Sequence, residues 1–176
     1  MNTLPKHIGL VGPKGVGKTT LADKLVREHG YKRLTFAATL KEMCAVFLRN
    51  FGLPEQEVNE RVYGSLKEDT IPGLGVTARH LMQTLGTEWG RRQVGHGIWV
   101  AIASRQATEW LAQGHSVVSD DVRFDNEAVA LKNAGLTIVQ LSREGYTPPT
   151  DGHASEAGIS PELIDINHTL KDTNEG

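Results

Sequence analysis

Residues 12–19, GPKGVGKT, match the pattern G-x-x-x-x-G-K-[ST] at every fixed position. The glycines of such a segment let the backbone turn tightly, so that successive N–H groups can converge on phosphate oxygens. A short apolar run at 7–11 precedes the segment, and a stretch with one apolar face follows it at 19–29. A strand, a glycine-rich loop and a helix in this order predict a phosphate-binding loop and a site for a nucleoside triphosphate.

Two side chains of this loop carry specific expectations. Lys18 is placed to bring a mobile positive charge to the β- and γ-phosphates, and the hydroxyl of Thr19 is placed to ligate Mg²⁺. The helix that begins here adds the positive end of its dipole. The loop therefore predicts binding of a nucleoside triphosphate with Mg²⁺, but it does not say how the nucleotide is used.

The rest of the chain alternates between apolar runs typical of strands and amphipathic stretches typical of helices. Strands are expected at 7–11, 32–38, 116–119, 136–142 and 163–170, and helices at 19–29, 40–51, 77–85, 98–113 and 126–134. Gly86 and Gly90 are expected to interrupt the chain after 77–85, and the polar stretch 55–77 is expected to form a short helix and a mobile loop. The alternation predicts a three-layer α/β/α fold with a mostly parallel sheet of about five strands, in a single domain over residues 1–176.

Apolar spacing within two of the helices predicts which side chains are buried. On the helix at 40–51, the positions i, i+3, i+4, i+7, i+8 and i+11 form one apolar stripe, which consists of Leu40, Met43, Cys44, Phe47, Leu48 and Phe51. On the helix at 98–113, Trp99 and Trp110 share a face and are expected in the core. Cys44 is expected to be a buried, inert thiol.

Composition excludes several classes of function. The formal net charge is −2, so the chain has no overall basic field of the kind that draws proteins to nucleic acids. A single cysteine rules out an internal disulfide and any multi-cysteine metal site, and the histidines show no metal-ligand spacing. The N-terminal segment lacks the apolar region of a signal peptide, and no apolar run approaches membrane-spanning length. We therefore expect a cytoplasmic protein with neither a nucleic-acid nor a membrane partner.

The middle of the chain contains candidates for a second binding site. Arg79, Gln83 and Thr87 fall at i, i+4 and i+8 and form a polar stripe beside an apolar one, and Arg91 follows Gly90. A small kinase needs such cationic groups to bind the acceptor of its phosphoryl group. A guanine-nucleotide switch would need an Asn-Lys-x-Asp base reader, which this sequence does not contain. The alternative for the stripe is the solvated face of an amphipathic helix.

Charged residues follow two of the expected strands. Asp120 and Asp121 come directly after 116–119, Arg123 lies two places further on, and Arg143 follows the strand at 136–142. Ligands bind at this edge of open α/β sheets. Adjacent carboxylates need a cation, and Mg²⁺ bound to the nucleotide is the expected one. Because successive strand residues point to opposite faces, only one of the two acids should serve the metal.

The residues after Arg123 offer it an alternative role. Asp125 and Glu127 could form a surface ion pair with Arg123, although both acids are more simply explained as capping groups of the helix at 126–134. Asp125 is the expected N-cap of that helix, and Gly135 is its expected stop.

Taken together, these motifs resemble those of the deoxynucleoside monophosphate kinase family of tailed bacteriophages. The matching blocks occur in the family's order over nearly the whole chain: FAATLK at 36–41, RHLMQTLGTEWGR at 79–91, IWV at 98–100, DVRFDNEA at 121–128, DGHASE at 151–156 and INHTL at 166–170. The resemblance implies a P-loop kinase fold, with an acceptor-binding helical region at roughly 37–100 and a lid-like loop at roughly 143–161.

The same resemblance implies roles for individual residues. The ATP phosphates would be bound by Lys14, Gly15, Val16, Gly17, Lys18, Thr19 and Thr20. The acceptor nucleotide would be bound by Ala37, Ala38, Lys41, Arg79, Gln83, Glu88, Trp89 and Arg91. Arg123 and Arg143 would neutralise the phosphates during transfer, with Lys18 and Asp121 completing the catalytic set. Register with DVRF favours Asp121 over Asp120 as the acid that serves the metal beside Thr19, and His153, Ser155 and Glu156 of DGHASE are expected at a helix N-cap.

The resulting hypothesis is an ATP- and Mg²⁺-dependent enzyme that phosphorylates a deoxynucleoside 5′-monophosphate to the diphosphate. Its partner is then a small molecule, a homodimer is possible, and a phage-encoded chain would work in the host-cell cytoplasm. Two other uses stay open: a P-loop kinase for another small acceptor, such as dephospho-coenzyme A or a sugar, and a nucleotide-dependent switch without kinase activity. The base that is accepted cannot be read from the sequence.

Overall fold

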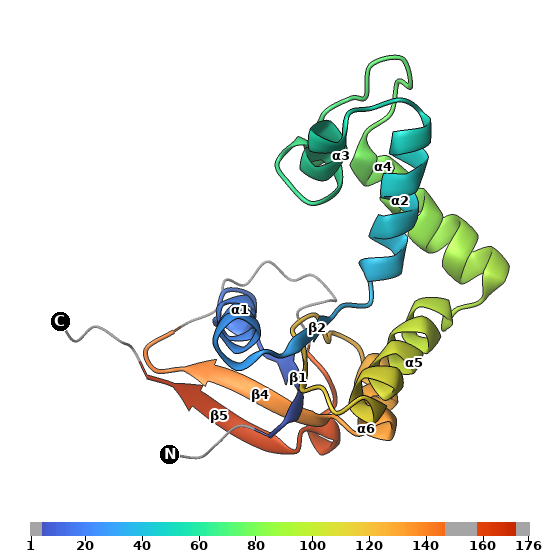
Figure 1. Cartoon of the computed structure of the whole chain (residues 1–176). Coiled ribbons are helices and arrows are strands. Elements are labelled where there is room, and N and C mark those ends of the chain that lie inside the picture. Colours follow the sequence, from blue (N-terminus) through green and yellow to red (C-terminus); the bar gives the residue numbers. More distant parts are fainter. Residues whose placement is uncertain (1–4, 147–157, 172–176) are drawn as a thin grey trace. The chain divides into compact units, whose positions relative to one another are not determined.

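The computed structural model describes residues 5–146 and 158–171. The chain divides into two compact units (Figure 1). Unit 1 combines Met1–Thr35 with Ala103–Gly176, and unit 2 is the continuous stretch Phe36–Ile102. Among the described residues, no helix has both the length and the apolar character needed to span a bilayer.

Unit 1 contains one sheet of five strands, all of whose pairings are parallel. The order across the sheet is β2-β3-β1-β4-β5. The strands are β1 (His7–Val11), β2 (Lys32–Leu34), β3 (Val117–Ser119), β4 (Thr137–Arg143) and β5 (Ile166–Leu170). The predicted parallel sheet is confirmed. The second strand is shorter than expected, because the chain turns at 36–37 and enters a helix at Ala38.

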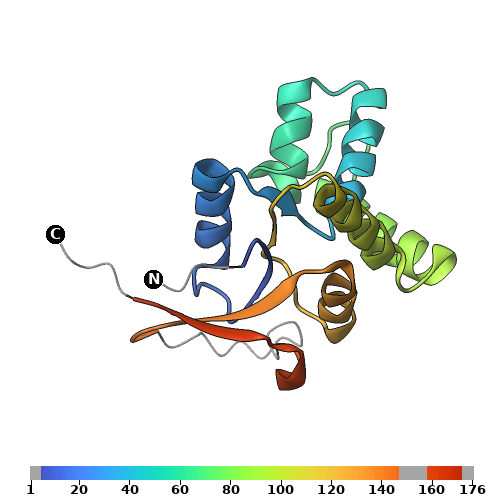
Figure 2. The same ribbon diagram turned by 60° about the horizontal axis from the view of Figure 1, so that its bottom comes forward.

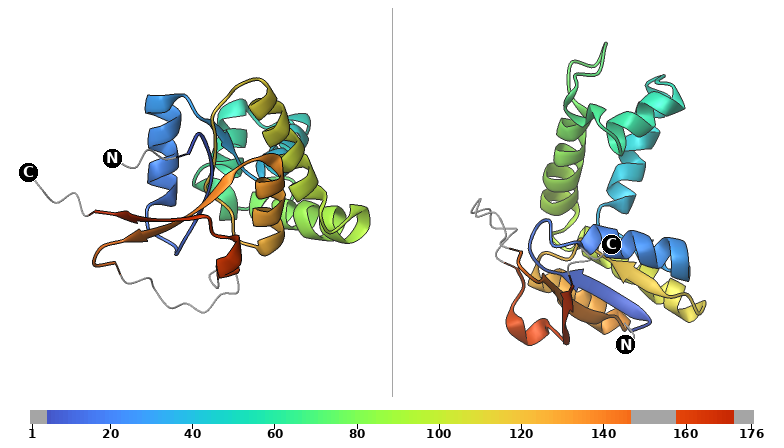
Figure 3. Two further views of the ribbon diagram at one scale, coloured as in Figure 1. Left: turned by 90° about the horizontal axis from the view of Figure 1, so that it is seen from below. Right: turned by 90° about the vertical axis from the view of Figure 1, so that its left-hand side faces the viewer.

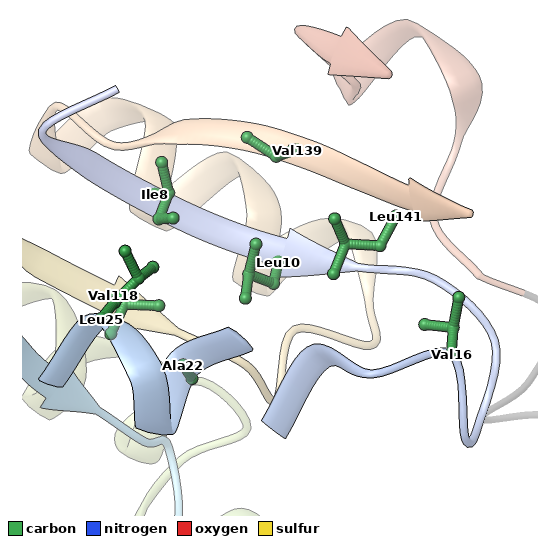
Figure 4. Packing of buried hydrophobic residues seen from close by; sticks show 8 residues of the cluster. All are labelled: Ile8, Leu10, Val16, Ala22, Leu25, Val118, Val139 and Leu141. Atoms are coloured by element: carbon green, nitrogen blue, oxygen red, sulfur yellow. The ribbon is translucent and has the colours of Figure 1, made fainter. Parts of the chain in front are cut away.

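The two faces of the central strand explain the layers around the sheet. Ile8 and Leu10 belong to a buried cluster with Ala22 and Leu25 of helix α1, Lys18–His29 (Figure 4). Gly9 points to the other face, where a Cβ would lie 3.2 Å from Leu131 of helix α6, Asp125–Ala134. Figures 2 and 3 show α1 and α6 on opposite sides of β1 and β4. This arrangement confirms the three-layer α/β/α fold.

One further helix of the sequence analysis, expected at 98–113, is confirmed. Helix α5, Ile98–Ala112, begins at the end of unit 2 and finishes in unit 1. Trp99 on this helix is buried as predicted, whereas Trp110 is only half-buried. A 3-10 turn, η4 (Pro161–Leu163), leads into β5.

Unit 2 has its own core. It contains α2 (Ala38–Asn50), α3 (Glu55–Val62), the 3-10 turn η1 (Leu66–Glu68) and α4 (Ala78–Gln83). Their buried side chains form one cluster, which consists of Cys44, Ala45, Leu48, Val58, Val62, Ile71 and Ala78. The stretch expected to be a mobile loop contributes to this cluster, because Ile71 has no exposed surface and its N–H donates to the Val76 carbonyl oxygen at 2.8 Å. Burial explains why this loop takes a defined path.

The apolar stripe of α2 is only partly buried. Cys44 and Leu48 are in the core, but 49% of Phe47 and 41% of Phe51 are exposed. The burial predicted for Cys44 is confirmed.

The helical conformation that begins with α4 does not end at Gly86 or Gly90. It continues as a π-helix, η2 (Thr84–Val94), in which Gly95 N–H still bonds to the Gly90 carbonyl oxygen at 2.9 Å. The predicted interruption at Gly86 and Gly90 was wrong, and packing gives the reason. The indole N–H of Trp99 donates to the Gly86 carbonyl oxygen at 2.9 Å, and a Cβ on Gly90 would lie 2.5 Å from the Trp99 ring. Gly90 lets η2 approach the indole, and Gly86 makes room for the side chain of Leu40.

The substitution Gly90→Ala is therefore expected to destabilise unit 2. A methyl group in contact with the rigid Trp99 ring should cost about 1–3 kcal/mol, in the range of overpacked cores. Thermal and urea unfolding followed by tryptophan fluorescence would measure the loss. Gly97→Ala is the matched control, because a Cβ there meets nothing within 4 Å. Equal stability of the two variants would contradict the packing role of Gly90.

Candidate active site

The loop between β1 and α1 depends on glycine at two close contacts. Gly12 has φ 138°, and a Cβ there would lie 2.6 Å from the carbonyl oxygen of Leu141 on β4. Gly17 has φ 112°, and a Cβ there would lie 2.9 Å from a guanidinium nitrogen of Arg143. Any other residue would be strained in both places. The backbone of the loop is thus in direct contact with β4.

The side chains of the loop are divided between the core and the surface. Val16 is buried in the cluster beneath α1, which leaves only its backbone available to a ligand. The ammonium group of Lys18 donates to the carbonyl oxygens of Gly12 and Pro13, at 2.6 and 2.9 Å. Its charge therefore lies within the turn of the loop. Lys14, Gly15, Thr19 and Thr20 are exposed.

The parallel strands bring several predicted residues to one edge of the sheet. The loop follows β1, Asp120 and Asp121 follow β3, and Arg143 is the last residue of β4. Because these strands run in the same direction, their carboxyl ends share an edge, which is where open α/β sheets bind ligands.

Asp120 has a cationic partner that was not predicted. Arg33 on β2 donates from Nε to Asp120 Oδ1 at 3.0 Å and from Nη2 to Asp120 Oδ2. The second Nη of Arg33 donates to Asp23 on α1 at 2.5 Å. Asp120 is only 8% exposed, and the hydrogen bond that its carboxylate accepts from Arg33 raises the pKa of Arg33. Both oxygens of Asp120 are thus engaged with an arginine.

Asp121 is in a different environment. It is half-buried, and Oδ1 accepts a hydrogen bond from the hydroxyl of Ser119 at 3.0 Å. The donor of this hydrogen bond is a neutral hydroxyl group, whereas the donor beside Asp120 is a guanidinium group. The two adjacent acids therefore differ in chemical environment.

The capping of α6 corrects one prediction. Phe124, not Asp125, is at the N-cap position, and the buried carboxylate of Glu127 accepts the N–H groups of Arg123 and Phe124 at 2.9 and 3.2 Å. Asp125 instead accepts the N–H and the hydroxyl of Ser160, at 2.7 and 2.5 Å, and these bonds lower its pKa. Both acids that were weighed as ion-pair partners of Arg123 are engaged elsewhere, and the Arg123 residue is exposed.

Arg143 lies at the N-terminus of α1. Gly17, beside its guanidinium group, is the N-cap residue of this helix. A phosphate group bound at this helix terminus would be close both to the guanidinium group and to the positive end of the helix dipole.

The predicted acceptor-binding residues all belong to unit 2. Ala37 is the N-cap of α2, Ala38 begins this helix, and the Lys41 ammonium group lies 5.7 Å from the ring centroid of Tyr63. Arg79 donates to Glu68 at 2.8 Å, and Arg92 to Glu88. The remaining residues of this set are exposed on α4 and η2: Gln83, Trp89 and Arg91.

The three residues of the polar stripe that the sequence suggested lie on two elements. Arg79 and Gln83 lie on α4, where residues four apart share a face. Thr87 lies on η2, where hydrogen bonds connect residues five apart, and all three residues are exposed. Trp89 on η2 is 40% exposed, and its ring centroid is 6.4 Å from that of Trp99.

Two residues near the loop were missed. Arg33 carried no motif, and only its place next to Leu34 in a buried strand could have suggested an internal ion pair. Tyr146 follows β4, and its hydroxyl donates to the Lys14 carbonyl oxygen at 2.5 Å. His153, Ser155 and Glu156 lie outside the described residues, as does most of the lid-like loop predicted at 143–161.

The donor set limits what kind of metal site is possible. Within residues 5–146 and 158–171, no three His, Cys, Asp or Glu side chains come together as a metal site. Mg²⁺ that arrives with a nucleotide needs only one or two protein ligands, because phosphates and water supply the rest. The hydroxyl of Thr19 and one carboxylate fit that requirement.

Fold and loop together define a class of protein. A parallel α/β/α sheet whose first strand leads through a G-x-x-x-x-G-K-T loop into a helix is the fold of the P-loop kinases. The family model described as deoxynucleotide monophosphate kinase matches residues 67–173, more than half of the chain. The chain belongs to the deoxynucleotide monophosphate kinase family, and it is therefore a phosphotransferase.

Individual relatives agree with this membership. A protein of Acanthamoeba polyphaga mimivirus named "Putative deoxynucleotide monophosphate kinase" is 32% identical over 165 residues, which cover 86% of this chain and 81% of the relative. The "Deoxynucleoside-5'-monophosphate kinase" of Escherichia phage T5 is 29% identical over 126 residues, 68% of this chain. The match covers 47% of the phage protein, so this chain spans about half its length. A crystal structure titled as a "putative kinase" from Chloroflexus aurantiacus aligns with 99% of this chain and 88% of its own, with a TM-score of 0.46 and 19% identity.

Proposed function

We propose that the protein transfers the γ-phosphoryl group of ATP to the 5′-phosphate of a deoxynucleoside monophosphate. The P–O bond to the β–γ bridging oxygen breaks, a bond to an acceptor phosphate oxygen forms, and ADP and the deoxynucleoside diphosphate are released. The observation that supports this best is the glycine-dependent loop, with the Lys18 ammonium group inside its turn and Arg143 at the N-terminus of α1.

The donor side of the reaction is assigned to unit 1. Backbone N–H groups of residues 14–20 bind the phosphates, and Lys18 moves from the loop carbonyls to the β- and γ-phosphates. Arg143 and Arg123 neutralise the charge that develops during transfer. Mg²⁺ bound with ATP would be held by the Thr19 hydroxyl and Asp121, and it would supply further charge neutralisation. Asp120, already paired with Arg33, is assigned a structural role.

The acceptor side is assigned to unit 2. Lys41 and the backbone around Ala37 and Ala38 bind the acceptor phosphate, with Arg79 and Arg91 as further cations. Gln83 and Glu88 supply hydrogen-bonding groups, and the exposed face of Trp89 offers a surface on which a base can stack.

The proposed reaction does not require a strong general base. The acceptor oxygen belongs to a phosphate that is already anionic near neutral pH, so no side chain has to remove a proton from it. Catalysis then consists mostly of positioning and charge neutralisation. This is why lysine and arginine side chains, rather than histidine, are the expected catalytic groups.

The proposed activity is tested by measuring ADP release in a coupled assay, with Mg²⁺, ATP and each of the four deoxynucleoside monophosphates in turn. We expect ADP release that depends on at least one of them and produces the matching diphosphate. Dephospho-coenzyme A, a sugar and a reaction without acceptor are run in parallel. If no deoxynucleotide stimulates ADP release, the proposal is wrong, and slow hydrolysis that ignores every small acceptor would instead indicate a switch.

Acceptor binding by unit 2 is tested with Arg79→Ala and Arg91→Ala. Each should raise KM for the deoxynucleotide about tenfold or more through the loss of a charge-assisted hydrogen bond, with little change in KM for ATP. Arg105→Ala is the matched control, because Arg105 is also an exposed arginine paired with a glutamate, Glu109. If both variants keep the wild-type KM for the acceptor, these arginines do not bind it.

A further inference from the structure

Strand β4 continues past the phosphate-binding loop. Gln140 pairs with Val11, the last residue of β1, and β4 runs on to Arg143. A turn then follows, in which the N–H of Tyr146 bonds to the Arg143 carbonyl oxygen at 3.3 Å, and the tyrosine packs against the core cluster beneath the loop. Its hydroxyl donates to the carbonyl oxygen of Lys14 at 2.5 Å. One side of the loop is therefore in contact with the end of β4.

Gly15 makes room for this contact. Its φ of 81° is in the left-handed region, and a Cβ on Gly15 would overlap the Tyr146 hydroxyl. The pattern G-x-x-x-x-G-K-[ST] does not require glycine at this position. Close approach of the tyrosine is a physical reason for the extra glycine in this sequence.

The hydrogen bond acts on one peptide unit of the loop. The Lys14 carbonyl and the Gly15 N–H belong to the same trans, planar unit, so they point in opposite directions. Because the Lys14 carbonyl oxygen is fixed by its hydrogen bond from the Tyr146 hydroxyl, the Gly15 N–H points away from the tyrosine. Loop N–H groups are the ligands of phosphate oxygens, and they bind best when they need no reorientation.

We propose that Tyr146 is a positioning residue for the donor nucleotide, which holds the Lys14–Gly15 peptide unit so that the Gly15 N–H is available to a phosphate oxygen of the triphosphate. The inference deepens the proposed function and rests on it. Tyr146 acts through the backbone of the loop rather than by touching the reacting atoms. Without its hydroxyl, this peptide unit can rotate, and part of the binding energy of ATP is spent on restoring its direction.

The test compares Tyr146→Phe with Tyr31→Phe. Tyr31 is a matched control, because its hydroxyl also donates to a backbone carbonyl, that of Pro5 at 3.1 Å, and its ring packs against the same core cluster. Each variant loses one hydroxyl and keeps its ring. Three quantities are measured: the affinity for ATP with Mg²⁺ by calorimetric titration without acceptor, KM for ATP, and KM for the deoxynucleotide.

We expect Tyr146→Phe to bind ATP about fivefold more weakly, as for the loss of one neutral hydrogen bond, with KM for the acceptor unchanged. Tyr31→Phe should bind ATP like the wild type, and both variants should melt at a lower temperature because each loses one hydrogen bond. Unchanged ATP affinity in Tyr146→Phe, or an equal loss in Tyr31→Phe, would overturn the inference. The titration needs no acceptor, so it measures ATP binding by the loop even if no phosphoryl transfer is found.

Discussion

Replacing Lys18 with alanine is expected to lower kcat about 10³-fold, the size of effect seen when a group that stabilises transition-state charge is removed. The ammonium group lies 2.6 Å from the Gly12 carbonyl oxygen, so its charge is held inside the turn that we propose as the phosphate-binding site. In the transition state it is placed to follow the phosphoryl group, where charge accumulates on the equatorial oxygens. The rate of ADP release at saturating ATP and deoxynucleotide measures the loss.

Two controls separate this effect from a damaged loop. Lys24→Ala removes an exposed lysine from the same helix and should leave kcat within about twofold, because solvated surface charges contribute little. Lys18→Arg keeps the positive charge but replaces the compact ammonium group with a planar guanidinium group, and it should recover only a small part of the activity. A Lys18→Ala variant that retains more than a tenth of the wild-type kcat, with a wild-type melting temperature, would contradict the assignment.

The two adjacent aspartates are expected to respond in opposite ways to the change to asparagine. Asp121→Asn should lower kcat about 10²- to 10³-fold, because a carboxylate that holds the metal is worth several kcal/mol of charge stabilisation. Its fold should be nearly intact, since the hydroxyl of Ser119 can still donate to the amide oxygen. Raising the Mg²⁺ concentration should restore part of the activity.

Asp120→Asn should mainly lower stability. The change removes the charge that faces Arg33, and losing a hydrogen bond to a charged group costs about 1.5–3 kcal/mol. Below its melting temperature the variant should keep most of its kcat and a wild-type dependence on Mg²⁺. Arg33→Lys, which removes the two-point contact and keeps the charge, should show the same pattern. If Asp120→Asn abolishes activity while Asp121→Asn does not, the assignments of the two acids are reversed.

Much of the fold could be predicted from local sequence patterns. The loop, the start of α1 and its stop at Gly30 follow from short-range chemistry, and β1 has the bounds that its apolar run indicates. The errors lie where distant packing overrides local preference. Gly86 and Gly90 suggest a break when read alone, but in the structure they fit against Trp99, which lies on the next helix.

The candidate site was predictable to a similar degree. Position at a strand end was enough to place Asp121 and Arg143 at one edge of the sheet. It could not find Arg33, because pairing of Arg33 with Asp120 depends on β2 lying next to β3, and the order of strands is not written in any one segment. Tyr146 escaped notice for the same reason, since its partner Lys14 is far away in the sequence.

The strand order also sets a sequence of events for the newly made chain. β1 is the central strand, yet its neighbours β3 and β4 come more than a hundred residues later, as the pairing of His7 with Val117 shows. Such distant pairings form slowly, because closing a long loop costs conformational entropy before the strands make any stabilising contact. Unit 2 is continuous in sequence and has its own core. It can therefore fold on the ribosome before β3 and β4, the strands that pair with β1, have been synthesised. We therefore expect the phosphate-binding loop, which follows β1, to be among the last parts of unit 1 to reach its final shape.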